Sequence, residues 1–326
     1  MRAIVVREFG GPDVMRLEDV PTPEPTGSQV LVRIIASGVN PVDTYLRSGN
    51  HAHAPKLPYT PGKDAAGVAE LVGENVNGIK PGDRVYTADS LSGTYAEYSL
   101  CDEAQLGLLP DNTSFEAGAG VWTPYATSYR ALFEKAQVKA GESVLVHGAS
   151  GGVGIAAVQW AKNAGLNVIG TAGSDRGKQL VSEQGADLVV DHLSSSPEEA
   201  ARAKADILEF TGGKGVDVIV EMLANVNLLL DFDVLAMFGR IAVVGNRGTL
   251  EFNPRAAMTK DATIYGLSLF NAPQTVRESI RDAIYKGLSD SYLHPVISRT
   301  FELSEAAEAH REVIESRALG KIVLLP

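Results

Sequence analysis

The stretch Val144-Leu-Val-His-Gly-Ala-Ser-Gly-Gly-Val-Gly154 decides the fold of this chain. A short apolar strand, Ser143–His147, leads directly into a cluster of glycines, and residues 152–164 are typical of a buried helix. Strand, glycine-rich turn and helix in this order match the dinucleotide fingerprint G-x-G-x-x-G. Its three small-residue positions fall on Ala149, Gly151 and Gly154. A second strand follows at 166–171, so the pattern predicts a nucleotide-binding βαβ unit. A glycine-rich turn in another α/β protein is the alternative.

Each small residue of the fingerprint has a physical task. The first allows the tight turn from strand to helix, the second lets the backbone approach a pyrophosphate, and the third lets helix and strand pack closely. The start of the helix then offers free N–H groups and a partial positive charge to the phosphates.

Composition limits the classes of function. The net charge of -11 argues against a general binder of nucleic acids or anionic membranes. The single cysteine excludes an internal disulfide framework and a zinc lobe built from several cysteines. No apolar run approaches the roughly 18 residues that a membrane span needs. We therefore expect a cytoplasmic protein that does not enter a membrane.

The pattern of predicted strands and helices changes near residue 140. Residues 1 to 120 contain many short β-type runs separated by glycine and proline turns, which predicts a β-rich domain. From Glu142 onward strands and helices alternate, which predicts a doubly wound parallel sheet. The last strand, 321–325, lies too far from that sheet in the sequence to belong to it, so we expect it to return to the first domain. The predicted boundaries are 1–123, 124–266 and 267–326.

The end of the second strand indicates the type of cofactor. NAD-binding proteins place an acidic residue there to hold the ribose 2′-hydroxyl. This chain instead has Thr171-Ala-Gly-Ser174, followed by Arg176 and Lys178. Small, hydroxyl and basic residues suit a 2′-phosphate, which a carboxylate would repel. The sequence therefore favours NADP over NAD; the alternative is that the two basic residues are solvated charges at a helix start.

Several stretches together resemble one family, the zeta-crystallin-type quinone oxidoreductases of the medium-chain dehydrogenase/reductase superfamily. The stretches are Gly38-Val-Asn-Pro-Val-Asp-Thr-Tyr45, Leu57-Pro-Tyr-Thr-Pro-Gly62, Lys80-Pro-Gly-Asp-Arg-Val85, Gly93-Thr-Tyr-Ala-Glu-Tyr98, residues 140–154 and Glu221-Met-Leu-Ala-Asn-Val-Asn227. The resemblance covers nearly the whole chain. It implies a discontinuous GroES-like β-barrel domain beside a Rossmann domain, with NADPH and the substrate in the cleft between them.

The zinc-dependent branch of that superfamily differs at positions that can be checked. It carries a zinc-binding cysteine near Asn40 and a Gly-His-Glu where this chain has Gly62-Lys-Asp64. It also carries four clustered cysteines, which this chain lacks. The pair His51 and His53 lies in a loop rich in glycine and proline and is read as solvated. We therefore expect no metal.

The resemblance also implies site residues. The pyrophosphate is expected on Ser150, Gly151, Gly152 and Val153, and the 2′-phosphate near Gly173, Ser174, Lys178 and His192, with a further phosphate contact from Arg317. The nicotinamide and its ribose are expected against Tyr45, Asn227, Val244, Gly245, Asn246, Arg247, Leu267, Ser268 and Leu269. The catalytic residues are expected to be Asn40, Tyr45 and Thr127.

The predicted reaction is hydride transfer from NADPH to a quinone, in which Tyr45 and Asn40 donate hydrogen bonds to the oxygen that becomes anionic. One alternative is reduction of an enone or enoyl thioester. Another is a mainly non-catalytic role, as a crystallin or in RNA binding, against which the negative charge argues. The family resemblance implies a homodimer, and a tetramer remains open.

Overall fold

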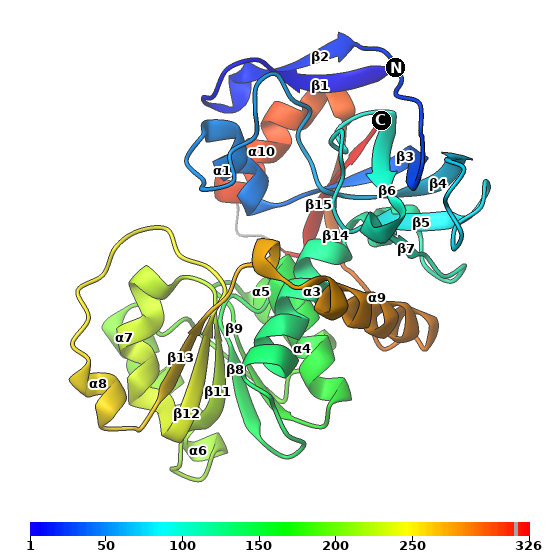
Figure 1. Cartoon of the computed structure of the whole chain (residues 1–326). Coiled ribbons are helices and arrows are strands. Elements are labelled where there is room, and N and C mark those ends of the chain that lie inside the picture. The colour runs from blue at the N-terminus through cyan, green and yellow to red at the C-terminus, as the bar shows by residue number, and fades with distance from the viewer. Residues whose placement is uncertain (316–318) are drawn as a thin grey trace. The chain divides into compact units, whose positions relative to one another are not determined.

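The computed structural model describes residues 1–315 and 319–326 (Figure 1). It contains two compact units, one of residues 1–123 with 281–326 and the other of residues 124–280. The sequence placed the second boundary at 266, at the end of the last sheet strand. The segment that follows β13 and leads into α9 (Gln274–Ser289) is tied to the second unit, since the carbonyl oxygen of Ser268 accepts from Arg130 Nη1.

The second unit is built on a six-stranded sheet in which every neighbouring pair is parallel. Its strands are β8 (Ser143–Val146), β9 (Asn167–Thr171), β10 (Leu188–Val190), β11 (Val216–Glu221), β12 (Leu235–Val243) and β13 (Thr263–Gly266). They lie in the order β10-β9-β8-β11-β12-β13. The chain winds outward from β8 in one direction and from β11 in the other. The predicted doubly wound sheet is therefore confirmed, and its switch point lies between β8 and β11, where such sheets bind ligands.

Helices cover both faces of this sheet because right-handed crossovers in opposite directions place helices on opposite sides. They are α3 (Trp122–Tyr129) with a π-helical continuation at Arg130–Lys135, α4 (Gly152–Asn163), α5 (Asp175–Glu183), α6 (Pro197–Phe210), α7 (Ala224–Val234) and α8 (Arg255–Met258). In Figure 1, α4 and α7 flank the strands on opposite sides. Leu145, Ile169 and Ile219, one from each of three neighbouring strands, are fully buried in a core that also receives α6 and α7.

The first unit is rich in β-structure and discontinuous in sequence. Its strands are β1 (Arg2–Val6), β2 (Met15–Asp19), β3 (Gln29–Val39), β4 (Asp64–Val72), β5 (Arg84–Thr87), β6 (Tyr98–Asp102), β7 (Leu106–Leu108), β14 (Ile297–Glu302) and β15 (Lys321–Leu325). The long strand β3 pairs antiparallel with β4, β6 and β15. Its pairing with β15 confirms that the C-terminal segment returns to the first domain.

Among its described residues, the first unit also contains three α-helices beside the C-terminal part of α9. They are α1 (Pro41–Ser48), α2 (Phe115–Ala119) and α10 (Ala306–Glu315). Gly38 lies where α2 meets β3, and a Cβ atom there would approach the carbonyl oxygen of Ala119 to 2.1 Å. None of the helices within the described residues is long and apolar enough to cross a membrane.

Candidate functional site

The glycine-rich turn lies at the C-terminal end of β8. Gly148 adopts a positive φ of 54°, so the tight turn is made one residue before the expected position, Ala149. Ala149 is instead buried, and its N–H donates to the carbonyl oxygen of Thr171 at 2.9 Å. A Cβ atom at Gly154 would lie 2.4 Å from the carbonyl oxygen of Gly148, so glycine is needed there for the close packing of helix on strand.

The start of α4 has the form of an anion site. Ser150, Gly151, Gly152 and Val153 are all half-buried, so the turn remains accessible. A Cβ atom at Gly151 would meet only the carbonyl oxygen of Gly148, at 3.5 Å. The N–H groups of Gly152 and Val153 precede the helix's own hydrogen-bond ladder and point from its positive end. These residues fit a pyrophosphate.

The end of β9 brings together the residues expected at the 2′-phosphate. His192 Nδ1 lies 2.9 Å from Thr171 Oγ1, and a Cβ atom at Gly173 would lie 3.0 Å from the His192 ring. Ser174 caps α5, and its Oγ accepts from a backbone N–H at 3.1 Å. Lys178 Nζ forms an ion pair with Asp191 Oδ1 at 2.7 Å, a contact that was not predicted from the sequence. Arg317 lies outside the described residues.

The loops after β11 and β12 are joined to each other. The N–H of Val244 donates to the carbonyl oxygen of Glu221 at 2.8 Å, and the N–H of Ala224 donates to that of Gly245 at 3.0 Å. Asn246 Oδ1 accepts from the N–H of Asn225 at 3.0 Å. The N–H of Arg247 donates to Asn225 Oδ1, and the N–H of Leu267 donates to the carbonyl oxygen of Val243. The carbonyl oxygen of Ser268 accepts from Arg130 Nη1, and Leu269 begins a short 3₁₀ turn.

Asn227 carries an unused acceptor at this edge of the sheet. It lies on the first turns of α7 and is 7% exposed. Its Nδ2 donates to Glu221 Oε1 at 3.2 Å, whereas its Oδ1 is buried with no hydrogen-bond partner among the described residues. A buried polar atom without a partner is costly, and a ribose hydroxyl is a donor that could satisfy it.

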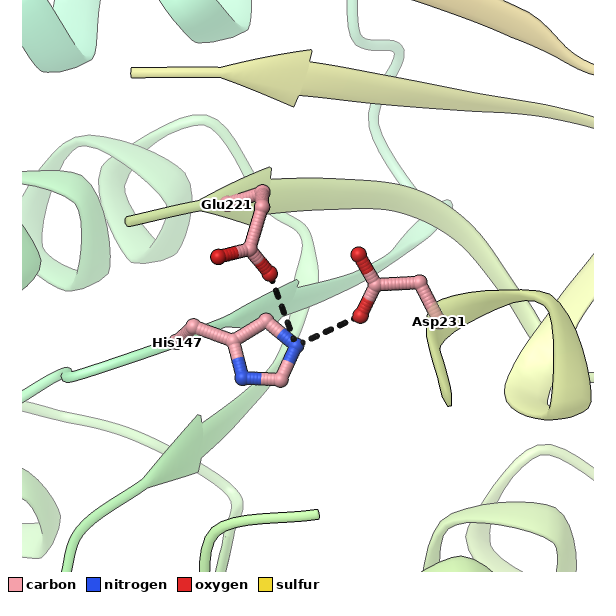
Figure 2. Close-up of side chains that lie close together, drawn as sticks. All are labelled: His147, Glu221 and Asp231. Carbon is pink, nitrogen blue, oxygen red and sulfur yellow. Dashed lines mark hydrogen bonds and ion pairs between the residues drawn. The ribbon is translucent and has the colours of Figure 1, made fainter. Parts of the chain in front are cut away.

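Three buried ionisable side chains meet beneath these loops (Figure 2). His147 Nε2 lies 2.8 Å from Asp231 Oδ1 and 3.5 Å from Glu221 Oε2. Burial lowers the pKa of His147, but the hydrogen bond and charge of Asp231 and the charge of Glu221 outweigh it, so the pKa is raised. Burial raises the pKa of Glu221 to about 7. Donor atoms of the three lie within 4.8 Å of one another, a spacing that a metal ion could bridge.

This cluster was not predicted from the sequence. Glu221 belonged to a motif that carried the family resemblance, but His147 was read only as a strand residue. Its neighbours lie far along the chain and come together because β8 and β11 are adjacent in the sheet.

In the first unit, α1 positions Asn40 and Tyr45. The N–H of Asn40, just before the helix, donates to Asp43 Oδ2 at 2.8 Å, and Gly49 ends the helix with a φ of 77°. Tyr45 is half-buried, whereas Asn40 is only 3% exposed. Thr127, the third predicted catalytic residue, is 8% exposed and lies in α3 of the second unit.

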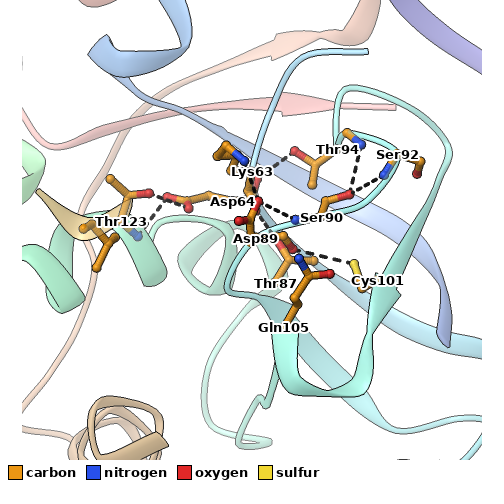
Figure 3. A network of polar contacts seen from close by, with 12 residues as sticks. Lys63, Asp64, Thr87, Asp89, Ser90, Ser92, Thr94, Cys101, Gln105 and Thr123 are labelled. Atoms are coloured by element: carbon orange, nitrogen blue, oxygen red, sulfur yellow. Dashed lines mark hydrogen bonds and ion pairs between the residues drawn. The ribbon is translucent and has the colours of Figure 1, made fainter. Parts of the chain in front are cut away.

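The Asn40 side chain belongs to a buried polar network around Asp64, part of which is shown in Figure 3. Asn40 Nδ2 donates to Asp64 Oδ2 at 3.0 Å, and Lys321 Nζ donates to Asn40 Oδ1 and to Asp64 Oδ2. Thr123 donates to the same carboxylate from its backbone N–H and, at 2.7 Å, from its hydroxyl. One N–H of the Asn40 amide remains for another acceptor.

Comparison with known proteins shows which family the chain belongs to. An alcohol dehydrogenase GroES-like domain model matches residues 26–128, and a zinc-binding dehydrogenase model matches residues 152–284. The whole chain is 47% identical to the quinone oxidoreductase of Homo sapiens, with 98% of that protein covered. This chain belongs to the quinone oxidoreductase family.

Other quinone oxidoreductases agree with this assignment. That of Pseudomonas aeruginosa is 33% identical over 98% of this chain and 97% of its own length. The crystal structure of the Escherichia coli quinone oxidoreductase complexed with NADPH matches with a TM-score of 0.88 at 29% identity, covering both chains completely. The predicted combination of a Rossmann sheet with a GroES-like domain is confirmed.

One matching family model describes zinc-binding dehydrogenases. This chain, however, has other residue types at the positions where we expect the zinc-dependent branch to carry its zinc ligands. Asn40 stands in place of the cysteine, and Lys63 and Asp64 stand in place of histidine and glutamate. Asn40 and Asp64 are bound to each other and to the ammonium group of Lys321. The ammonium group of Lys321 therefore binds the oxygen atoms of Asn40 and Asp64 that would otherwise be available to a metal ion.

Proposed function

We propose that this chain reduces a quinone with NADPH by hydride transfer that needs no metal ion. Its family membership at 47% identity supports an NADPH-dependent oxidoreductase. The observation that carries the choice of cofactor is the end of β9, where Ser174, Lys178 and His192 gather and the position of the NAD-binding acid is taken by small residues. Hydroxyl, ammonium and imidazole groups suit a phosphate.

The residues of the second unit have distinct tasks in this proposal. The N–H groups at the start of α4 hold the pyrophosphate, and the unused Oδ1 of Asn227 accepts from the nicotinamide ribose. Val244–Arg247 and Leu267–Leu269 line the ribose and ring. NADPH, when bound, supplies the hydride.

The residues of the first unit act on the acceptor. The half-buried hydroxyl of Tyr45 donates to the quinone oxygen as charge develops on it, and the remaining N–H of Asn40 is the second donor. Lys321 and Asp64 hold the Asn40 amide in one orientation. Thr127 is proposed to lie near the nicotinamide. Stacking a quinone at reacting distance supplies most of the catalysis, so no strong general acid is required.

The test compares substrates and cofactors directly. We expect turnover of simple quinones with NADPH, slower turnover with NADH and little reduction of enones or 2-enoyl thioesters. Tyr45→Phe is expected to lower kcat about tenfold, the effect of losing one hydrogen bond to a developing charge. Activity at the uncatalysed level in this variant would make Tyr45 an obligatory proton donor and refute the mechanism. Faster reduction of the enones would refute the quinone assignment.

We also propose that two copies pair through β13, the edge strand of the parallel sheet. Ile264 on that strand is 36% exposed, and Phe238 and Met258 near the same edge are 72% and 71% exposed. The backbone N–H of Phe238 donates to the carbonyl oxygen of Lys260 at 2.7 Å, which ties β12 to the segment just before β13. Sedimentation is expected to show a dimer for the parent and a monomer for Ile264→Lys; a monomeric parent would refute the pairing.

A further inference from the structure

The buried cluster of His147, Glu221 and Asp231 lies at the switch point of the parallel sheet. His147 directly follows β8, Glu221 ends β11 and Asp231 lies in the last turn of α7 (Figure 2). All three are at most 1% exposed. None of them reaches the surface on which the cofactor is proposed to bind, so any effect on binding must pass through another residue.

Glu221 is the member of the cluster that contacts the loops of the site. Its Oε1 accepts from the backbone N–H of Leu223 and from Asn227 Nδ2. Its backbone carbonyl accepts from the N–H of Val244. The side chain of Glu221 therefore sets the orientation of the Asn227 amide, while its main chain ties the β11 loop to the β12 loop.

The other oxygen of Glu221 depends on the cluster. Oε2 is buried with no hydrogen bond and faces His147 Nε2 at 3.5 Å, while that same nitrogen is hydrogen-bonded to Asp231. A buried carboxylate without a nearby positive partner is expensive. Asp231 holds the imidazole ring so that Nε2 stays close to Glu221 Oε2. Removal of Asp231 would leave His147 free to turn and Glu221 free to move away.

We propose that Asp231 and His147 are positioning residues that hold Glu221 and, through it, the Asn227 amide and the β11–β12 loops in the form that binds the nicotinamide ribose. This inference rests on the proposed function for the role of Asn227. In this positioning relay, Asp231 on α7 orients His147 at the end of β8, and His147 in turn orients Glu221 at the end of β11. Within it, only Asn227 and the loop backbone touch the cofactor.

The experiment compares three variants of α7. Asp231→Ala removes the acceptor for His147, whereas Asp231→Asn keeps an oxygen in the same place. Leu228→Ala is the matched control, because Leu228 is a buried apolar residue of the same helix and lies outside the cluster. The measurements are the Kd for NADPH from fluorescence titration, kcat with a quinone, and amide hydrogen exchange at Leu223 in the cofactor-free enzyme.

We expect Asp231→Ala to raise the Kd for NADPH about tenfold, the size expected for one misplaced hydrogen bond. Its kcat at saturating NADPH should stay within about twofold of the parent, and the Leu223 amide should exchange faster. Asp231→Asn should restore both the Kd and the slow exchange. Leu228→Ala should lower the Tm but leave the Kd for NADPH and the exchange rate of the Leu223 amide unchanged.

An unchanged Kd and unchanged Leu223 exchange in Asp231→Ala would overturn the proposal. An equal rise in Kd in Leu228→Ala would also overturn it, because the effect would then be one of general packing. Asp231→Leu, which fills the space that alanine leaves empty, replaces the alanine variant if the latter does not fold. Asn227→Ala separates the two proposals: an unchanged Kd there, with faster Leu223 exchange in Asp231→Ala, refutes the role of Asn227 and retains the positioning relay.

Discussion

Replacing Lys321 by methionine tests the buried network of the first unit. Methionine keeps most of the volume of the side chain but removes its ammonium group. In the parent, that group donates to Asn40 Oδ1 and to Asp64 Oδ2, and the side chains of Lys321 and Asp64 are 5% and 1% exposed. The variant therefore leaves a buried carboxylate without its cationic partner.

The expected cost follows from the remaining contacts. Breaking a buried ion pair by removing one partner costs about 3–5 kcal/mol of unfolding free energy. Asp64 keeps three other donors, one from Asn40 and two from Thr123, so we expect the lower end, about 3 kcal/mol. This corresponds to a fall of roughly 6–12 °C in the Tm of a unit of this size. Adding Asp64→Asn removes the stranded charge and should recover about half of the loss.

The assay can follow the first unit alone. The chain has two tryptophans, Trp122 in the first unit and Trp160 in the second, so a Trp160→Phe background leaves one reporter. Urea unfolding is then measured for the parent, Lys321→Met and the double variant. Lys286→Met is the control, since Lys286 pairs with Asp290 at the surface and its loss should leave the midpoint unchanged. A Lys321→Met midpoint equal to that of the parent, or a double variant no more stable than Lys321→Met, would refute the reasoning.

Two further predictions concern the cofactor and the pH. Lys178→Ala should raise the KM for NADPH and leave that for NADH unchanged, whereas Asp191→Asn, which releases the Lys178 ammonium, should lower the KM for NADPH. Equal changes for the two cofactors in steady-state kinetics would contradict this assignment. Burial, followed by the charge of Arg47, lowers the pKa of His310 from 6.5 to about 3. Because the folded pKa is depressed, the stabilisation is present above pH 6.5 and is lost as the pH falls, by roughly 3 kcal/mol at pH 4. His310→Gln should remove this loss, so urea midpoints of parent and variant should converge or cross between pH 6.5 and 4; parallel curves would show that His310 does not titrate in this way. Burial raises the pKa of Asp43 to about 6, which acts in the opposite sense and is present in both proteins.

The glycine-rich turn illustrates what the sequence could predict. Glycine has a steric meaning that does not depend on the rest of the chain, so the strand, turn and helix around 144–154 were predicted within a residue or two. The predicted tight turn was one residue late, since positive φ falls on Gly148 and the fingerprint counts from Ala149. Local patterns cannot resolve such a shift when several small residues are adjacent.

Long-range pairs were beyond the sequence. The contact of His147 with Asp231 joins residues 84 positions apart, and that of Lys321 with Asn40 joins residues 281 apart. Neither has a spacing signal, because each depends on which strands become neighbours. The strand β14 and the helix α10 were likewise not predicted, since both lie in the tail that the sequence assigned only as a return to the first domain.

The single cysteine has a consequence for the proposed reduction of quinones. Quinones are electrophiles that add to thiolates, and an enzyme working among them risks arylation of its own sulfur. Cys101 is fully buried, and burial raises the pKa of its thiol to about 12. Near neutral pH only about one molecule in 10⁵ carries the reactive thiolate, and it is shielded from solvent. An enzyme with this arrangement can turn over quinones repeatedly without arylation of its cysteine.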